Sequence, residues 1–152
     1  PEGTRSVSDD SLLLSNQLCF LVHRLDRAIV ARYKPLLAAL GLTYPQYLAM
    51  LALWEHGQLS VGRLCELLDL DTGTVSPLLK RMEAAGFVER KRRADDEREV
   101  CVSLTERGTA LKKRAASVPG ALASCVLRGR DEYASLMATL GGLLARLSGP
   151  PC

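Results

Sequence analysis

The sequence predicts a mainly α-helical (α+β) chain built around a winged helix-turn-helix, and two kinds of segment indicate this fold. Capped, amphipathic stretches cover residues 11–86, which is the pattern of consecutive helices. Two short extended stretches, 87–92 and 99–104, then enclose a polar tip, which is the pattern of a β-hairpin. Two helices joined by a short turn and followed by such a hairpin form a winged helix-turn-helix.

The first helix is expected to run from Ser11 to Leu40. Its apolar stripe is wider than one neighbouring helix requires, so we expect it to pair with a second copy of the chain. The start of this helix is left open, because it begins either at Ser11 or after a cap at Asn16. The stripe consists of Leu14, Leu18, Leu21, Val22, Leu25, Ile29 and Leu36.

The second helix has clear signals at both ends. Thr43 has the pattern of an N-cap, with Pro45 in the first turn and Gln46 at the third helical position, as in a capping box. Gly57 follows the last apolar residues and favours the end of a helix. We therefore expect a helix from Thr43 to about His56.

Two further helices follow across a turn of about three residues. Ser60 predicts the start of a short helix over 61–68. Asp71 or Thr72 caps the next helix, which is expected to end before Gly86. This last helix has the length and position of a recognition helix, which fits the major groove of DNA.

One face of the predicted recognition helix carries small polar and basic side chains, which reach base edges and phosphates. The opposite face is apolar and is expected to pack into the protein. The predicted DNA-binding residues of this helix are Thr72, Thr74, Ser76, Lys80 and Arg81.

The hairpin is basic, with an uninterrupted run from Arg90 to Arg93. Cations that neutralise phosphates release counterions, so this wing is expected to supply affinity that does not depend on base sequence. Arg98 at the tip is expected to enter the minor groove, with Asp96 holding it in position. The predicted DNA-binding residues of the wing are Arg92, Arg93, Asp96 and Arg98. We expect the partner to be double-stranded DNA with a pseudo-palindromic operator.

The C-terminal part is expected to be helical. Thr105 opens a fifth helix, and an apolar pattern returns over 121–147 after an interruption at Pro119 and Gly120. We expect a single domain over residues 11–147. Its DNA-binding lobe covers about 44–104, and its dimerisation helices cover about 11–40 and 105–147.

Composition excludes several classes of protein. The ten N-terminal residues are polar and acidic, unlike a signal peptide, and no apolar run is long enough for a membrane span. A cytoplasmic protein without membrane contact is therefore expected. The five cysteines form no CxxC pair, which argues against a zinc site or a disulfide scaffold. We expect no metal, no cofactor and no catalytic residues.

The stretch from Asp95 to Gly108, DDEREVCVSLTERG, resembles the wing signature of the MarR (multiple antibiotic resistance regulator) family. The resemblance extends over residues 11–147 and implies an obligate homodimer. Two further stretches resemble the organic hydroperoxide resistance regulators, the OhrR branch. They are NQLCF at 16–20, and YKPLL at 33–37 with LTYPQY at 42–47.

The resemblance to this branch implies a redox sensor. Cys19 is the position of the peroxide-reactive thiol, and Tyr33 and Tyr44 are the positions of tyrosines that bond to its sulfur. Cys125 lies in the region where two-cysteine members carry a resolving cysteine of the other subunit. His23 stands where relatives often have an aromatic residue. A repressor that leaves its operator when an organic hydroperoxide oxidises Cys19 is therefore expected.

The chemistry of the residues also supports a reactive Cys19. A thiol reacts as the thiolate, which a helix N-terminus and donated hydrogen bonds both favour.

The sequence leaves two other functions open. If Cys19 is only a core residue, the chain is instead a MarR-type repressor that responds to a noncovalent phenolic ligand. A thiol peroxidase is the third possibility, but it needs a recycling reductant, for which the sequence has no CxxC motif.

Overall fold

The computed structural model describes residues 10–93 and 99–149. The chain forms two compact units, Pro1–Lys112 and Lys113–Cys152. The division of residues 11–147 into a DNA-binding lobe and dimerisation helices stays a prediction. The elements are η1 (Leu14–Asn16), α2 (Leu18–Ala38), α3 (Tyr44–His56), β1 (Leu59–Ser60), α4 (Val61–Leu68), α5 (Thr72–Ala84), β2 (Val88–Arg92), β3 (Val100–Leu104), α6 (Glu106–Ala115), α7 (Val118–Val126) and α8 (Arg130–Leu147).

The first helix begins later than Ser11, because the preceding segment folds as a 3-10 turn. The Gln17 side-chain amide donates hydrogen bonds to the carbonyls of Ser11 (2.7 Å) and Leu13 (3.0 Å). These bonds hold the segment in a turn, since side-chain amides compete with the helix for backbone groups. Helix α2 therefore starts at Leu18, which leaves Cys19 in its first turn.

The predicted caps of the next three helices are confirmed. Thr43 and Gln46 form a reciprocal capping box at the start of α3, with the Thr43 amide donating to the Gln46 side chain at 2.9 Å. Ser60 caps α4, and the Asp71 carboxylate accepts a hydrogen bond from the Thr74 amide at 2.8 Å at the start of α5. Each cap satisfies an amide that the helix itself leaves unpaired.

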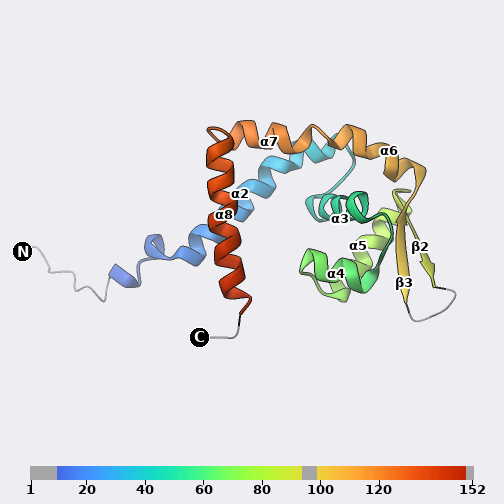
Figure 1. Cartoon of the computed structure of the whole chain (residues 1–152), viewed down its shortest axis with the longest axis horizontal. Coiled ribbons are helices and arrows are strands. Elements are labelled where there is room, and N and C mark those ends of the chain that lie inside the picture. Colours follow the sequence, from blue (N-terminus) through green and yellow to red (C-terminus); the bar gives the residue numbers. More distant parts are fainter. Residues whose placement is uncertain (1–9, 94–98, 150–152) are drawn as a thin grey trace, which may run out of the picture. The chain divides into compact units, whose positions relative to one another are not determined.

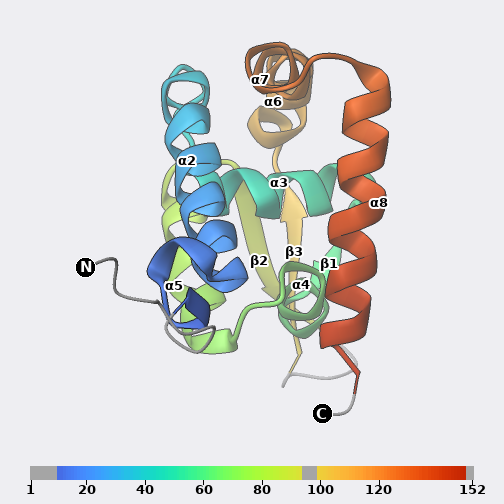
Figure 2. The same cartoon turned by 90° about the vertical axis from the view of Figure 1, so that its left-hand side faces the viewer.

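The predicted hairpin is confirmed, and a short strand that the sequence did not indicate extends it. Strands β2 and β3 pair antiparallel, with Arg92 opposite Val100 and Val88 opposite Leu104. Within the described residues the sheet has the order β1-β3-β2, where β1 is only two residues long. A two-residue strand is too short to show an alternating pattern. In the orthogonal view α3 crosses the sheet near the end of β3 (Figure 2).

The core of the first unit lies between α3, α4, α5 and the sheet. Figure 1 shows α4 and α5 side by side next to the β2–β3 hairpin. Leu53, Leu64, Val75, Leu79 and Val102 are fully buried there. Apolar residues from four different elements thus meet in one core, which fixes α5 against its neighbours.

The interruption expected at Pro119 and Gly120 lies slightly earlier, because α6 ends at Ala115 and α7 begins at Val118. Helix α7 begins at Val118, so both residues lie in its first turn, where a proline removes no helical hydrogen bond. A second break follows α7, where Leu127 is extended and Gly129 has a φ of 158°, a conformation that favours glycine. The apolar pattern expected over 121–147 therefore spans two helices, α7 and α8.

Helices α2 and α8 have apolar faces that the single chain leaves exposed. On α2 these side chains belong to Leu18, Leu21, Val22 and Leu25. On α8 they belong to Tyr133, Leu136, Met137, Leu140, Leu144 and Leu147. Across residues 10–93 and 99–149, no helix combines the length and apolar character needed to cross a bilayer.

Candidate functional site

Helix α5, the predicted recognition helix, is held in place by the turn that precedes it. Asp69 ends α4 in the left-handed conformation (φ 52°), and its amide donates back to α4. Asp71 then caps α5 two residues later. Because both ends of this turn are fixed, the face that α5 presents to solvent is fixed as well.

The two faces of α5 differ as predicted. Val75, Leu78, Leu79 and Met82 are buried on the inner face. The five candidate DNA-binding residues of this helix divide by exposure. Thr72, Thr74, Lys80 and Arg81 are exposed, and Ser76 is half-buried. The solvent face of α5 thus presents small hydroxyls near its start and cations one to two turns later.

The basic residues of the wing, 90–93, do not form one exposed surface, because Arg90 is half-buried and binds Glu83 on α5. Its guanidinium donates to the Glu83 carboxylate on α5 at 2.6 and 2.9 Å, and its amide donates to the same carboxylate at 3.1 Å. Both guanidinium nitrogens donate to Oε2 and the amide to Oε1, and this charge-assisted contact ties β2 to α5. Arg90 is therefore a strut between helix and wing. No pattern in the sequence indicates this contact, since the two residues lie on different elements.

The other wing residues have separate surroundings. Arg92 is exposed at the end of β2. Arg93 donates to the Glu99 carboxylate at 2.7 Å across the base of the hairpin tip. Asp96 and Arg98, which the sequence predicts at the tip, lie outside the described residues.

Glu83→Gln is expected to destabilise the protein at neutral pH and to weaken operator binding. The hydrogen bonds from Arg90 hold the pKa of Glu83 below its usual value. The stabilisation is therefore present above that usual value and is lost as pH falls through the lowered pKa. In urea unfolding between pH 3 and 7, wild type and variant should differ most at pH 7 and converge in acid.

The matched control is Glu89→Gln, which breaks an ion pair with Lys91 on the same strand. These side chains are 46% and 73% exposed, so this pair contributes little. Equal destabilisation by both variants at pH 7 would contradict the role of Glu83 as a strut.

The candidate thiol lies at the start of α2. Cys19 is exposed and is the second residue of the helix. Among the described residues the first turn has no acidic side chain, and no side chain caps its amides. The partial positive charge of this helix end is thus not offset by a side chain of the first turn.

The two candidate tyrosines lie together at the other end of α2. The rings of Tyr33 and Tyr44 are 5.0 Å apart between centroids. Burial, and then the Asp26 carboxylate, raise the pKa of Tyr44 above its usual value. Its hydroxyl therefore stays protonated at neutral pH and remains a hydrogen-bond donor.

Cys19 and Tyr33 cannot meet within one chain. Both residues lie on α2, fourteen positions apart, and a rise of 1.5 Å per residue separates them by about 21 Å along the helix. The hydrogen bonds expected between the sulfur and the two tyrosines are thus impossible within a single subunit. If they form, the thiol and the tyrosines come from different copies of the chain.

A pocket of about 610 Å³ lies beside the tyrosine pair. Val30 and Leu42 contribute apolar surface, while Asp26 and Tyr44 contribute polar groups. The pocket lies on the flank of α2 and at the start of α3. Tyr44 therefore lies at the edge of this pocket.

The remaining described cysteines are also free. Cys125, the candidate resolving thiol, is exposed on α7. Cys65 is half-buried, not a fully buried core residue, and its sulfur lies 3.8 Å from the Thr72 hydroxyl. Cys101 is half-buried on β3.

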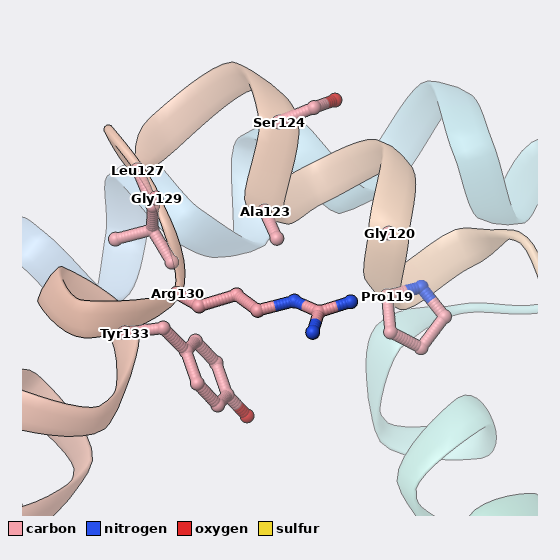
Figure 3. Close-up of a pocket in the computed structure, with 8 residues that line it drawn as sticks. All are labelled: Pro119, Gly120, Ala123, Ser124, Leu127, Gly129, Arg130 and Tyr133. Carbon is pink, nitrogen blue, oxygen red and sulfur yellow. The ribbon is translucent and has the colours of Figure 1, made fainter.

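The second unit contains a separate pocket of about 430 Å³ between α7 and α8. Figure 3 shows the Arg130 side chain extending across it toward Pro119, with the Tyr133 ring beside it. Leu127 and Ala123 supply apolar walls. Cys125 does not line this pocket, so the pocket and the candidate resolving thiol are distinct features of α7.

Comparison with known proteins gives consistent matches over most of the chain. The family model "Transcriptional regulator SarA/Rot" matches residues 31–115. The organic hydroperoxide resistance transcriptional regulator of Bacillus subtilis is 46% identical over 138 residues, which cover 91% of this chain and 94% of that protein.

Solved structures of AbfR, a protein of Staphylococcus epidermidis, are also similar. Reduced AbfR bound to DNA has a TM-score of 0.79 and 32% identity, covering 93% of this chain and 96% of that one. AbfR in its disulfide form has a TM-score of 0.63 and 33% identity, covering 92% and 93%. The winged-helix architecture expected from the sequence is confirmed by these neighbours.

Proposed function

Because the chain belongs to the MarR family of transcriptional regulators and is of the organic hydroperoxide resistance type, we propose that it is a redox-controlled repressor. In its reduced form it binds double-stranded operator DNA, and oxidation of Cys19 by an organic hydroperoxide releases it. The observation that carries the proposal is the position of Cys19, exposed in the first turn of α2. The 46% identity to a hydroperoxide resistance regulator supports it.

DNA binding is assigned to α5 and the wing. The exposed face of α5 supplies hydroxyls and cations, and the Glu83–Arg90 strut holds the wing at a fixed angle to it. The solved DNA complex of AbfR, which has the same fold, supports this assignment. Two such helices in a symmetric dimer would read a pseudo-palindrome with half-sites roughly 34 Å apart.

A homodimer is part of the proposal. Four large apolar side chains on α2 and six on α8 are exposed, and clustered exposed apolar side chains are typical of protein–protein interfaces. A second copy of the chain has the same two faces and can cover them. The separation of about 21 Å between Cys19 and Tyr33 gives an independent reason, since only a second subunit can complete the sensor.

We propose that each sensor contains Cys19 of one subunit and Tyr33 and Tyr44 of the other. The thiolate attacks the terminal oxygen of the hydroperoxide ROOH and breaks the O–O bond. Sulfur is oxidised to the sulfenic acid, and the alkoxide takes up a proton to leave as the alcohol ROH. The protonated Tyr44 hydroxyl stabilises the anionic sulfur, and the neighbouring pocket accommodates the organic group R.

Cys125 of the other subunit is the proposed resolving thiol. Its sulfur displaces hydroxide from the sulfenic acid, which gives a disulfide and one molecule of water. The exposure of Cys125 on α7 is consistent with such a reaction. A disulfide requires Cα atoms within about 7 Å, so the two helices must approach each other.

The shared sensor is tested with a heterodimer that has Cys19→Ser in one subunit and Tyr33→Phe with Tyr44→Phe in the other. A sensor built across subunits leaves one complete site in this heterodimer, whereas a sensor within one chain leaves none. We expect its thiol to form sulfenic acid at the wild-type rate, measured by mass spectrometry of the Cys19 peptide. Oxidation as slow as in the double-tyrosine homodimer would exclude the shared site.

The function as a whole is tested by gel-shift titration on the DNA upstream of the coding sequence, with and without an organic hydroperoxide. Release should accompany consumption of about one equivalent per Cys19. Continued consumption would instead indicate a thiol peroxidase. An unchanged affinity after complete oxidation of Cys19 would exclude redox control.

The pocket beside Tyr44 also favours a second candidate, a repressor controlled by a noncovalent phenolic ligand. Its volume of about 610 Å³ is sufficient for a small aromatic molecule. This function does not need the thiol. Release by a phenolic acid that is equal in wild type and Cys19→Ser would establish it.

A further inference from the structure

Helix α3 extends from the proposed sensor to a contact with α6. Its first residue is Tyr44, next to the proposed sensor, and Trp54 lies in its last turns. The Trp54 indole N–H donates to the Gly108 carbonyl on α6 at 3.0 Å. The Lys112 ammonium, one turn further along α6, donates to the Trp54 carbonyl at 3.0 Å. These two contacts, here called the Trp54 clasp, join the end of α3 to α6.

The part of α6 that forms the Trp54 clasp also packs against the connection between α5 and β2. Gly108 packs so closely on the Phe87 carbonyl that a Cβ atom would lie 2.0 Å from its oxygen. The Thr105 hydroxyl donates to the Gly86 carbonyl at 2.6 Å and accepts from the Gly108 amide at 3.0 Å. Gly86 and Phe87 connect α5 to β2. The first turn of α6 and this connection therefore move together.

A second connection runs through aromatic rings inside the same lobe. Tyr33 contacts Tyr47 at 5.7 Å between ring centroids, and Tyr47 contacts Trp54 at 6.5 Å. Tyr47 is only 2% exposed, so the rings between the two ends of α3 are closely packed. A movement of Tyr44 can therefore displace Trp54 in two ways. It can move helix α3 as a rigid body, or it can act through the packed rings of Tyr33 and Tyr47.

We propose that Trp54 is a positioning residue that transmits the state of the sensor to the DNA-binding surface. Loss of the Tyr44 contact on oxidation shifts α3, and the Trp54 clasp carries this shift to the α5–β2 connection. The angle between recognition helix and wing then changes. The inference rests on the proposed function for its signal, whereas the mechanical connection itself is independent of the chemistry of Cys19.

The test is a double-mutant cycle on operator affinity with Trp54→Phe, which keeps an aromatic ring but removes the N–H donor. Tyr44→Ala is used to mimic loss of the sensor contact. Tyr44 and Trp54 lie about 15 Å apart along α3, a distance at which unconnected sites have additive effects. We expect Tyr44→Ala to weaken operator binding about tenfold in the wild-type background and less than threefold with Trp54→Phe.

Lys112→Met provides a second variant, because it opens the same clasp without altering the core. Its matched control is Lys113→Met, which removes the same charge from the next residue of α6. Lys112→Met should reduce the effect of Tyr44→Ala, and Lys113→Met should not. Equal tenfold effects of Tyr44→Ala in all backgrounds would overturn the proposal. Urea unfolding confirms that each variant is folded.

Operator binding after hydroperoxide treatment distinguishes a failure of this proposal from a failure of redox control. Oxidised wild type should leave the operator, while oxidised Trp54→Phe should stay bound even though its Cys19 is oxidised to the same extent. If oxidised wild type stays bound, redox control fails, and the double-mutant cycle alone decides the role of Trp54. If both proteins leave the operator equally, the clasp does not transmit the signal.

Discussion

Cys19→Ser is expected to give a protein that binds the operator with wild-type affinity and ignores organic hydroperoxide. Allosteric coupling usually changes affinity by about 5- to 150-fold, so oxidised wild type should bind at least about tenfold more weakly than the reduced form. The variant should change by less than twofold, because a serine hydroxyl cannot form a sulfenic acid. Gel-shift titrations with and without hydroperoxide, at one salt concentration, measure the difference.

The matched control is Cys101→Ser. Cys101 is also a free thiol, but it lies half-buried on β3 in the wing. This variant should respond to hydroperoxide as the wild type does. A Cys19→Ser protein that still left its operator on hydroperoxide treatment would show that another group senses the oxidant.

Gly108→Ala is expected to destabilise the protein by about 3 kcal/mol, since its methyl group would overlap the Phe87 carbonyl oxygen. The obstacle is backbone, which cannot rotate away as a side chain does. Strand β2 and helix α6 would have to separate, and the Trp54 clasp would be strained with them. Urea unfolding at a fixed protein concentration gives the change in free energy, because dimer stability depends on concentration.

Gly120→Ala is the matched control, since it makes the same change in α7. No heavy atom lies within 4 Å of a Cβ at this position. An alanine there should be neutral or stabilising by up to about 1 kcal/mol, because alanine favours a helix. If Gly108→Ala were as stable as Gly120→Ala, the close contact between α6 and Phe87 would not be a feature of the folded protein.

Much of the fold could be predicted because its signals are local. Thr43, Ser60 and Asp71 were identified as caps, and each bonds to an amide only three residues away. The extended stretch at 99–104 likewise identified strand β3, in which Val102 is fully buried. Such patterns appear in a single sequence because the interacting groups are neighbours along the chain.

The ends of helices were predicted less accurately where one residue type is typical of two different local structures. The sequence predicts a break at Pro119, whereas the break between α6 and α7 precedes this residue, because proline is favoured in the first turn of a helix. The start of α2 could not be chosen between Ser11 and Asn16 from the sequence. The choice depends on where the Gln17 side chain finds its acceptors, and these bonds favour a turn over an extended first helix.

The sequence alone therefore determined the order of helices α2 to α5 and of the hairpin strands β2 and β3, the inner and outer faces of α5, and the candidate thiol Cys19. Only the tertiary structure identified the Glu83–Arg90 strut and the Trp54 clasp. The physical reason is the separation of the partners along the chain. Trp54 and Gly108 are 54 residues apart, and no periodic pattern relates groups that meet only when the chain folds.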